Sequence, residues 1–435
     1  MAFSLKGIKV PHRKNTAGCK VERLVTENTI TLPTSMHIGR PAIPVVKPGD
    51  EVCVGTLVAR EGDGLSSPIY SSVSGKVAGI ADVFLSNGSK VPAIRIDSDG
   101  EMTVDENITP PVLNSREDVI AAVKASGVVG LGGAGFPTYA KFMTDKKIEY
   151  LVVNGAECEP YITSDTYTME ERAEEIAHAI DVLVKYMNIE KVVIGIEKNK
   201  PGAINKMKEL ASKRSNASVS VLPSIYPAGG EKVLVYRTTG RKIGEGKLPI
   251  DVGCVVCNCT TLATLGNYFK TGMPLVEKCV TVDGSAVKSP KNVIVSIGIS
   301  VGEVFDFCGG FSSEPGKVLY GGPMMGISIP DLDEPVLKQT NALIAFNQKD
   351  SKPAKETACI QCGTCLCNCP FGINATEIIR TYNKGEFERL DKLGINLCME
   401  CGSCAYNCPA NRPLVQMHKI IKADLREWKA KEVKA

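Results

Sequence analysis

The residues of this chain whose chemistry is most evident are cysteines close to its C-terminal end. They form two runs of equal spacing, each followed by a proline: Cys359, Cys362, Cys365 and Cys369, then Cys398, Cys401, Cys404 and Cys408. Each run reads C-x2-C-x2-C-x3-C-P, a spacing in which three thiolates hold one [4Fe-4S] cluster and the fourth ligates the other cluster. We therefore predict one cluster on Cys359, Cys362, Cys365 and Cys408, and a second on Cys398, Cys401, Cys404 and Cys369. A structural zinc site would use two separated pairs and would not explain the duplication.

A second cysteine pattern, Cys254 and Cys257, has C-x-x-C spacing and precedes Asn258. Such a pair can be a redox-active dithiol, because the spacing lowers a thiol pKa and permits a tight disulfide. Cysteines also fill small buried spaces without any reactivity. Both interpretations are open from the sequence.

A glycine-rich stretch in the first half of the chain is a candidate cofactor loop. It contains four glycines within six residues, followed by Phe136 and Lys141: Gly130, Gly132, Gly133 and Gly135. Glycines allow backbone N–H groups to approach a phosphate closely, and we expect the helix that follows to add its positive N-terminal end. Lys141 would offer charge to the phosphate or the ring, and Phe136 would pack on a ring.

Polar residues follow an apolar run at residues 150–153: Asn154, Glu157 and Glu159. A continuous apolar run is typical of a buried parallel strand, whose carboxyl end opens into a ligand crevice. A solvated loop is the alternative for the two glutamates. Further along, Glu231 begins a predicted helix, and Asn258 follows another short apolar run.

The elements that must position these residues form an α/β multidomain protein. At 435 residues, the chain suggests about three domains. Residues 30–97 consist of short apolar runs separated by turn residues, which indicates a small β domain. Residues 117–196 alternate helical and strand patterns, which favours a parallel sheet. Residues 276–310 again read as short strands.

Composition narrows the protein class. Hydrophobic residues at 43% and charged residues at 23% are ordinary values for globular proteins, and a net charge of +3 gives no footprint for nucleic acid. We find no apolar run that would span a bilayer and no signal peptide. Seventeen cysteines without an export signal point to metal or redox chemistry in a reducing, cytoplasmic compartment.

Taken together, these motifs resemble the C subunit of the Rnf complex and the related flavin subunit of respiratory complex I. The resemblance covers nearly the whole chain and implies NADH, FMN and two [4Fe-4S] clusters as the working parts. It places Asn154, Glu157, Glu231 and Asn258 on the flavin side and Glu159 on the NADH side. It also implies these parts: an N-terminal barrel-sandwich, lipoyl-like β domain (1–112), an FMN/NADH-binding α/β domain (113–265), a β-grasp, SLBB-like insert (266–315), a return to the nucleotide domain and a linker (316–350) and an α-helical 2[4Fe-4S] ferredoxin-like domain (351–435).

The electron acceptor is the least determined part of this interpretation. The first residues, with His12 and Lys14, depart from the Gly-Gly-Val-His-Pro-Pro stretch that opens the Rnf protein. That departure and the extra cysteines favour PrdC-type paralogues, which would make the D-proline reductase system the protein acceptor. The alternatives are a membrane-peripheral Rnf subunit with other Rnf subunits as partners, a cobalamin reductase of similar build, and a non-enzymatic ferredoxin-type scaffold without flavin.

Overall fold

The computed structural model describes residues 5–432 and begins with a β domain of two small sheets. The four-stranded sheet has the order β2 (Thr29–Pro33), β8 (Lys90–Ser98), β7 (Gly75–Phe84) and β4 (Glu51–Val52). The three-stranded sheet contains β3 (Ile43–Pro44), β5 (Leu57–Arg60) and β6 (Ile69–Tyr70). Alternate residues of β2 and β8 point into a shared core, as period-2 patterning requires. The predicted barrel-sandwich β domain is confirmed.

The β7–β8 hairpin tip is docked against another part of the chain. The amide and hydroxyl groups of Ser86 donate hydrogen bonds of 2.9 and 2.5 Å to the carboxylate of the buried Glu334. A tip held in this way cannot serve as a swinging carrier arm.

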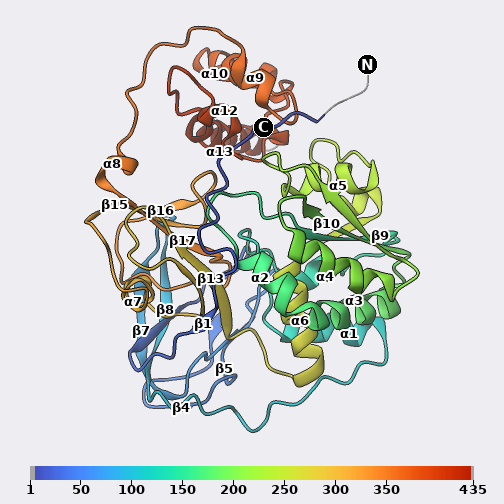
Figure 1. Cartoon of the computed structure of the whole chain (residues 1–435), viewed down its shortest axis with the longest axis vertical. Helices are drawn as coiled ribbons and strands as arrows, with labels where there is room; N and C mark the ends of the chain where they lie inside the picture. Colours follow the sequence, from blue (N-terminus) through green and yellow to red (C-terminus); the bar gives the residue numbers. More distant parts are fainter. Residues whose placement is uncertain (1–4, 433–435) are drawn as a thin grey trace.

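A parallel sheet forms the centre of the α/β domain. Its strand order is β11 (Ala217–Leu222), β10 (Lys191–Glu197), β9 (Tyr150–Gly155) and β12 (Cys254–Asn258). One face packs against α3 (Ala173–Met187), α4 (Pro201–Ser212) and α6 (Cys259–Thr271), and the other against α5 (Glu231–Thr239). Figure 1 shows this layering, with α1 (Arg116–Ala125) and α2 (Ser164–Glu171) beside the sheet. Both faces are covered, which explains the uninterrupted apolar runs in the sequence.

A six-stranded mixed sheet lies next to the barrel-sandwich domain. Its order is β1 (Glu22–Arg23), β14 (Lys291–Ser296), β13 (Glu277–Asp283), β17 (Ala342–Asn347), β15 (Pro315–Tyr320) and β16 (Ile327–Ile329), with α7 (Val301–Phe307) packed on it. The prediction that residues 316–350 return to the nucleotide domain is therefore wrong. Because β17 pairs with both β13 and β15, this segment completes the β-grasp sheet.

The C-terminal part is helical, as predicted. It contains α9 (Thr364–Asn368), α10 (Ala375–Asn383), α11 (Phe387–Asp391), α12 (Ser403–Tyr406) and α13 (Leu414–Glu432), whereas the short α8 (Gln348–Ser351) before them packs against β15 and β17. Ile421 and Leu425 of α13 pack against Ile378 and Leu390 of α10 and α11. Figure 1 shows this bundle above the rest of the molecule, joined to α8 by a long connection. Across residues 5–432, none of the helices combines the length and apolarity needed to cross a membrane.

Three lysines from outside the α/β domain donate hydrogen bonds to its main-chain carbonyls. Lys14 reaches the carbonyls of Glu157 and Glu159 at 2.9 and 2.8 Å. Lys278 of β13 reaches Leu131 at 2.6 Å. Lys338, in the loop before β17, reaches Gly127 at 2.8 Å and also binds the barrel-sandwich domain at Pro68. These lysines, defined here as the bridging lysines, join the domains through buried or partly buried charge.

Candidate functional site

Two asparagines mark the carboxyl edge of the parallel sheet. Asn154 is the residue before the last of β9, Asn258 ends β12, and the two are direct register partners. In the sheet, β10 and β11 lie on one side of β9 and β12 lies on the other. The strand order therefore reverses between β9 and β12, at the strands that end with the two asparagines. Ligands of open α/β sheets bind at such switch points. The structure therefore brings together two residues that lie more than a hundred positions apart in the sequence.

The glycine-rich loop lies against this edge. It closes as a short turn in which the Gly130 amide donates to the Phe136 carbonyl at 2.8 Å and the Gly135 amide donates to the Gly130 carbonyl at 3.0 Å. Gly133 and Gly135 have φ values of +121° and +65°, which favour glycine. A Cβ atom on Gly132 would lie 3.1 Å from the Asn258 amide nitrogen. The loop thus presents bare backbone next to Asn258.

The prediction that a helix follows the loop needs correction. Only a four-residue 3₁₀ turn, η1 (Thr138–Lys141), is present. The helix that begins beside the loop is α6, for which the Asn258 side chain is the N-cap and accepts from the Thr260 and Thr261 amides at 2.9 and 3.2 Å. Pro137 is the N-cap residue of this turn, which already ends at Phe142, so no long helix points its N-terminus at the loop.

Lys141 and Glu231 stand close to one another at the same edge. Their charged atoms are 3.6 Å apart, and Lys141 also donates to the Val256 carbonyl of β12 at 2.7 Å. Asn154 donates to the carbonyl of Gly229 at 2.9 Å, which fixes the turn before α5. The loop, both asparagines, the lysine and Glu231 therefore surround one region.

Glu157 occupies a different setting from these residues. Its carboxylate is buried and accepts hydrogen bonds from Lys200 at 2.7 Å, from the Asp165 amide at 2.7 Å and from Thr166 at 2.8 Å. Burial alone would raise its pKa, but Lys200 and Lys14 more than offset this, so the pKa of Glu157 is lowered. With its oxygens engaged internally, Glu157 supports the loop structure and leaves no free oxygen evident for a flavin contact.

Glu159 lies nearby with an unmet hydrogen-bonding capacity. One carboxyl oxygen accepts from the Met324 amide at 3.0 Å, whereas the other is buried without a partner. Burial raises the pKa of Glu159 to about 7, despite the opposing Met324 and Met325 amides and Lys14. An unpaired buried carboxyl oxygen is costly, which is consistent with a ligand supplying the missing donor.

Sequence reasoning missed Asp165 of α2, which binds Asn258 and the first turn of α6. Its carboxylate accepts from Asn258 and from the Thr260 hydroxyl, both at 2.7 Å. Lys200 and Lys278 were also missed. No local motif marks them, because each becomes relevant only through a partner far away in the chain.

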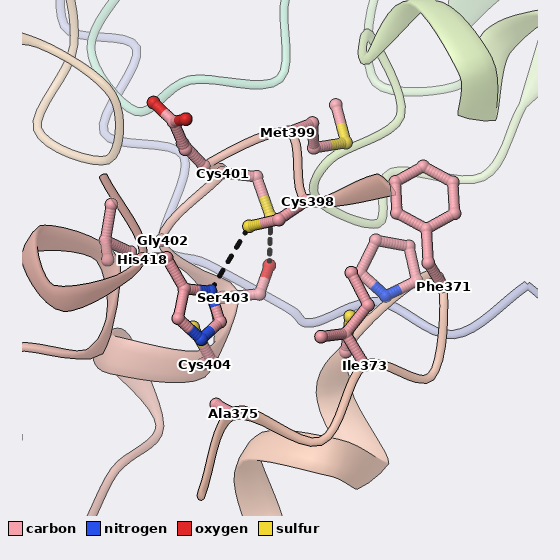
Figure 2. A pocket seen from close by; sticks show the side chains of 14 residues that line it. Phe371, Ile373, Ala375, Cys398, Met399, Cys401, Gly402, Ser403, Cys404 and His418 are labelled. Carbon is pink, nitrogen blue, oxygen red and sulfur yellow. Dashed lines mark hydrogen bonds between the residues drawn. The ribbon is translucent and has the colours of Figure 1, made fainter. Parts of the chain in front are cut away.

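The cysteines of the second run surround a common pocket. Cys369, Cys398, Cys401 and Cys404 line it together with Phe371, Ile373 and His418, as Figure 2 shows for the labelled residues. Burial raises the pKa of Cys404 to about 12, and the neighbouring Cys398, Cys401 and Cys369 thiols contribute. Cys369, the last cysteine of the first run, therefore lies beside the first three cysteines of the second run. This is the position that the predicted ligand set Cys398, Cys401, Cys404 and Cys369 requires.

The cysteines of the first run also lie close to the last cysteine of the other run. Cys365 and Cys408 share an apolar cluster, and burial followed by Cys408 and Cys359 raises the pKa of Cys365. The turn geometry is repeated: Gln361 and Glu400 have φ values of +55° and +59°, and Gly363 and Gly402 have +74° and +80°. Successive turns of this type direct amides toward an anionic Fe–S centre.

The cysteine spacing also distinguishes a cluster from a single ion. Each of the two runs supplies four cysteines at C-x2-C-x2-C-x3-C spacing, which is the ligand pattern of two [4Fe-4S] clusters, whereas a zinc ion uses two separated pairs. Four thiols around a shared apolar pocket fit a larger group, and thiolates are the ligands that [4Fe-4S] clusters use. The residues present therefore fit two cubane clusters.

The second cysteine run touches the cofactor edge. The Tyr226 hydroxyl donates to the Cys401 carbonyl at 2.5 Å. Met399 lies against Gly230, where a Cβ atom would come within 1.9 Å of its methyl carbon. Cys359 and Cys362 of the first run are exposed. The helical tail thus presents one cysteine run inward and the other outward.

The dithiol hypothesis for Cys254 and Cys257 is not supported by their geometry. Both lie on β12, three positions apart, so their Cα atoms are separated by roughly 10 Å at ~3.3 Å per residue, beyond disulfide reach. They point to opposite faces: Cys257 packs with the α3 and α6 core and Cys254 with the α5 core. Burial raises both thiol pKa values, that of Cys257 to about 11.

We expect Cys254 and Cys257 to resist alkylation equally with and without NADH in the native protein. Buried, protonated thiols are poor nucleophiles. Mass spectrometry after a short iodoacetamide pulse would measure this, with the exposed Cys19 as the labelled reference. Protection of both thiols only in the oxidised protein would restore the dithiol hypothesis.

Comparisons with protein families match four separate parts of the chain. Family models match as follows: the RnfC barrel sandwich hybrid domain at residues 3–101, the Nuo51 FMN-binding domain at 123–267, the SLBB domain at 279–328 and the 4Fe-4S dicluster domain at 356–412. The chain therefore contains an FMN-binding domain and a domain for two [4Fe-4S] clusters.

Several relatives are similar over most of their length. The C subunit of the proton-translocating ferredoxin:NAD(+) oxidoreductase complex of Clostridium ljungdahlii is 39% identical, covering 84% of this chain and 81% of the relative. The C subunit of the Na(+)-translocating complex of Acetobacterium woodii is 38% identical, covering 88% of each. The C subunit of the ion-translocating oxidoreductase complex of Rhodobacter capsulatus is 39% identical, covering 98% of this chain and 84% of the relative.

Among solved structures, the chain is similar to the NAD+-reducing [NiFe]-hydrogenase in the H2-reduced state. The TM-score is 0.49 at 17% identity, and the match covers 70% of this chain and 63% of that one.

Proposed function

Because this chain belongs to the family of C subunits of Rnf-type ferredoxin:NAD(+) oxidoreductase complexes, we propose that it exchanges electrons between NADH and a neighbouring subunit of such a complex. It is an NAD-linked electron-transfer oxidoreductase with FMN and [4Fe-4S] clusters. The observation that carries the proposal is the meeting of the Asn154–Asn258 edge, the glycine-rich loop and the inward cysteine run.

FMN, when bound, supplies the conversion between a two-electron hydride donor and one-electron iron–sulfur acceptors. The residues of the chain itself would bind FMN and the nicotinamide nucleotide and orient them relative to one another. The glycine-rich loop offers close backbone approach, and Asn154 and Asn258 hold the turns around the edge. Lys141 supplies positive charge, balanced by Glu231. Glu159, with its free buried oxygen, is the group we assign to the nicotinamide nucleotide.

The arrangement of the two cysteine runs supports an order for electron transfer. Cys401 is connected to Tyr226 beside the cofactor edge, so its cluster would exchange electrons with the flavin side. Cys359 and Cys362 are exposed, so their cluster would face the partner protein. Met399 and Tyr226 form the packed contact between the two parts.

The relatives favour an Rnf-type partner over the D-proline reductase system. The relatives described above are C subunits of ion-translocating oxidoreductase complexes, and none is linked to proline reductase. We propose that the chain, which lacks a membrane-spanning helix within residues 5–432, is membrane-peripheral on the cytoplasmic side through the other subunits of such a complex. Co-purification with them would support this, and recovery of proline reductase instead would reverse it.

Reconstitution tests the enzymatic proposal. Purified chain supplied with iron, sulfide and FMN should carry about eight irons, as two [4Fe-4S] clusters require, and should reduce a viologen or ferricyanide with NADH. Bleaching of the cluster absorbance on NADH addition is the second readout. Clusters without FMN binding and without NADH oxidation would instead identify a ferredoxin-type scaffold.

A further inference from the structure

Lys278 is a buried cation that the proposed chemistry does not use. It is the second residue of β13 in the SLBB-containing sheet and is only 4% exposed. Its ammonium donates to the carbonyl of Leu131, within the glycine-rich loop, at 2.6 Å. The Lys278 side chain therefore extends from the SLBB-containing sheet to the glycine-rich loop of the α/β domain.

Leu131 is held on its other side by α6. Its amide donates to the Thr261 hydroxyl oxygen at 3.0 Å, so Leu131 is fixed between Lys278 and the first turn of α6. The next residue, Gly132, lies against Asn258. Fixing Leu131 thus sets where the glycine backbone stands relative to the asparagine at the end of β12.

Charge links Lys278 to the same asparagine by a second route. The Asp165 carboxylate accepts from Asn258 and Thr260, and Lys278 stabilises its charged form. Asp165 is buried, and a buried carboxylate requires a compensating cation. Removing the Lys278 ammonium would affect both the loop carbonyl and the acid that orients Asn258.

We propose that Lys278 is a positioning residue of the FMN site, through which the SLBB-containing domain holds the glycine-rich loop and Asn258 in the geometry that binds FMN. The inference rests on the proposed function, because it presumes that FMN binds at this edge. It goes further by making flavin affinity depend on a residue of a different domain.

The pH dependence of flavin affinity gives a readout that a purely structural lysine would not move. Burial lowers the pKa of Lys278 to about 7, opposed by Asp165 and by the Cys279 thiol beside it. Asp165 in turn faces Glu157 and Lys200, which form their own ion pair. The ammonium is a stronger donor to the Leu131 carbonyl than the neutral amine, and only the ammonium offsets the charge of Asp165, so FMN affinity should fall about 10-fold or more as pH rises from 7 to 9.

The direct test is an FMN titration of the full-length chain with clusters loaded, followed by quenching of flavin fluorescence. Lys278→Met keeps the aliphatic stem and removes the charge, so we expect FMN to bind about 10- to 100-fold more weakly, as loss of a charged hydrogen bond predicts. The fall in affinity between pH 7 and 9 should be smaller in this variant, and the dependence that remains reports Glu159 and Lys14, whose pKa values are about 7 and about 8. Lys288→Met, an exposed lysine of the same domain, is the matched control and should bind FMN like the parent chain.

The outcomes separate the inference from the proposed function. If the parent chain binds no FMN, the proposed function fails. If parent and Lys278→Met bind FMN equally, with the same pH profile, the positioning role is refuted. If the variant does not fold, as judged by its iron content and circular dichroism, the parent's own pH profile decides: an affinity constant between pH 7 and 9 overturns the proposal.

Discussion

Replacing Cys369 by serine is expected to remove the [4Fe-4S] cluster of the second cysteine run, although Cys369 belongs to the first run in the sequence. The reason is geometric, because Cys369 lines the same pocket as Cys398, Cys401 and Cys404. Iron content should fall from about eight to about four per chain. NADH should still reduce bound FMN, whereas transfer to an external protein acceptor should be lost, since the inward cluster is the one beside Tyr226.

Double variants make the crosswise assignment decisive. Cys369→Ser combined with Cys398→Ser removes two ligands of the same cluster, so about four irons should remain. Cys369→Ser combined with Cys359→Ser should leave none. Cys367→Ser, an exposed cysteine outside both ligand sets, is the control and should retain both clusters. The opposite pattern for the two double variants would show that each run supplies all four of its own ligands.

The second large effect is expected at the buried Glu157–Lys200 ion pair. Both side chains are 4% exposed and 2.7 Å apart. Lys200→Met leaves the Glu157 carboxylate buried without its main cation, which should lower the free energy of unfolding by about 3–5 kcal/mol. Urea denaturation followed by circular dichroism measures this. Glu209→Gln in the exposed Lys213–Glu209 pair is the control, and its stability should stay close to that of the parent chain because solvent screens an exposed ion pair.

The sign of the pH dependence follows from the same pair. The pKa of Glu157 is lowered in the folded protein, so its stabilising contribution is present above its unfolded value and is lost as pH falls through the folded value. The pKa of Lys200 is raised, so its contribution persists to high pH. Adding Glu157→Gln to Lys200→Met should recover part of the loss. A single variant as stable as the parent would show that the pair contributes nothing.

The parts of the site that the sequence predicts are those with local signatures. The cysteine spacing, the glycine cluster and the polar residue after each apolar run are all short-range patterns, and they identify Asn154, Asn258 and the loop. The parallel sheet then places the two asparagines side by side, because carboxyl ends of parallel strands share an edge.

The incorrect expectations share a physical origin in long-range packing. Cys254 and Cys257 lie on opposite faces of β12, because residues three positions apart in a strand point to opposite sides. The C-x-x-C spacing alone does not show whether the two cysteines lie in a strand or in a turn. The flavin-side assignment of Glu157 stays a prediction, and the sequence gives no sign of its contact with Lys200, which lies 43 positions later. The strands after residue 315 have an apolar pattern that fits either the four-stranded parallel sheet or the six-stranded mixed sheet. The pattern alone therefore does not assign them to one of the two sheets.

The bridging lysines have a consequence for how proteins of this architecture can diversify. The family models divide the chain into separate modules, which suggests that each could be exchanged by recombination. A transplanted SLBB module without a lysine at position 278, or a new N-terminal arm without Lys14, would leave carbonyls of the recipient domain without their donor. A chimaera should therefore fold well only if each of these lysines and the loop that it binds come from the same parent protein. Recombination would then have to exchange both sides of each lysine contact together, even where they lie in different modules.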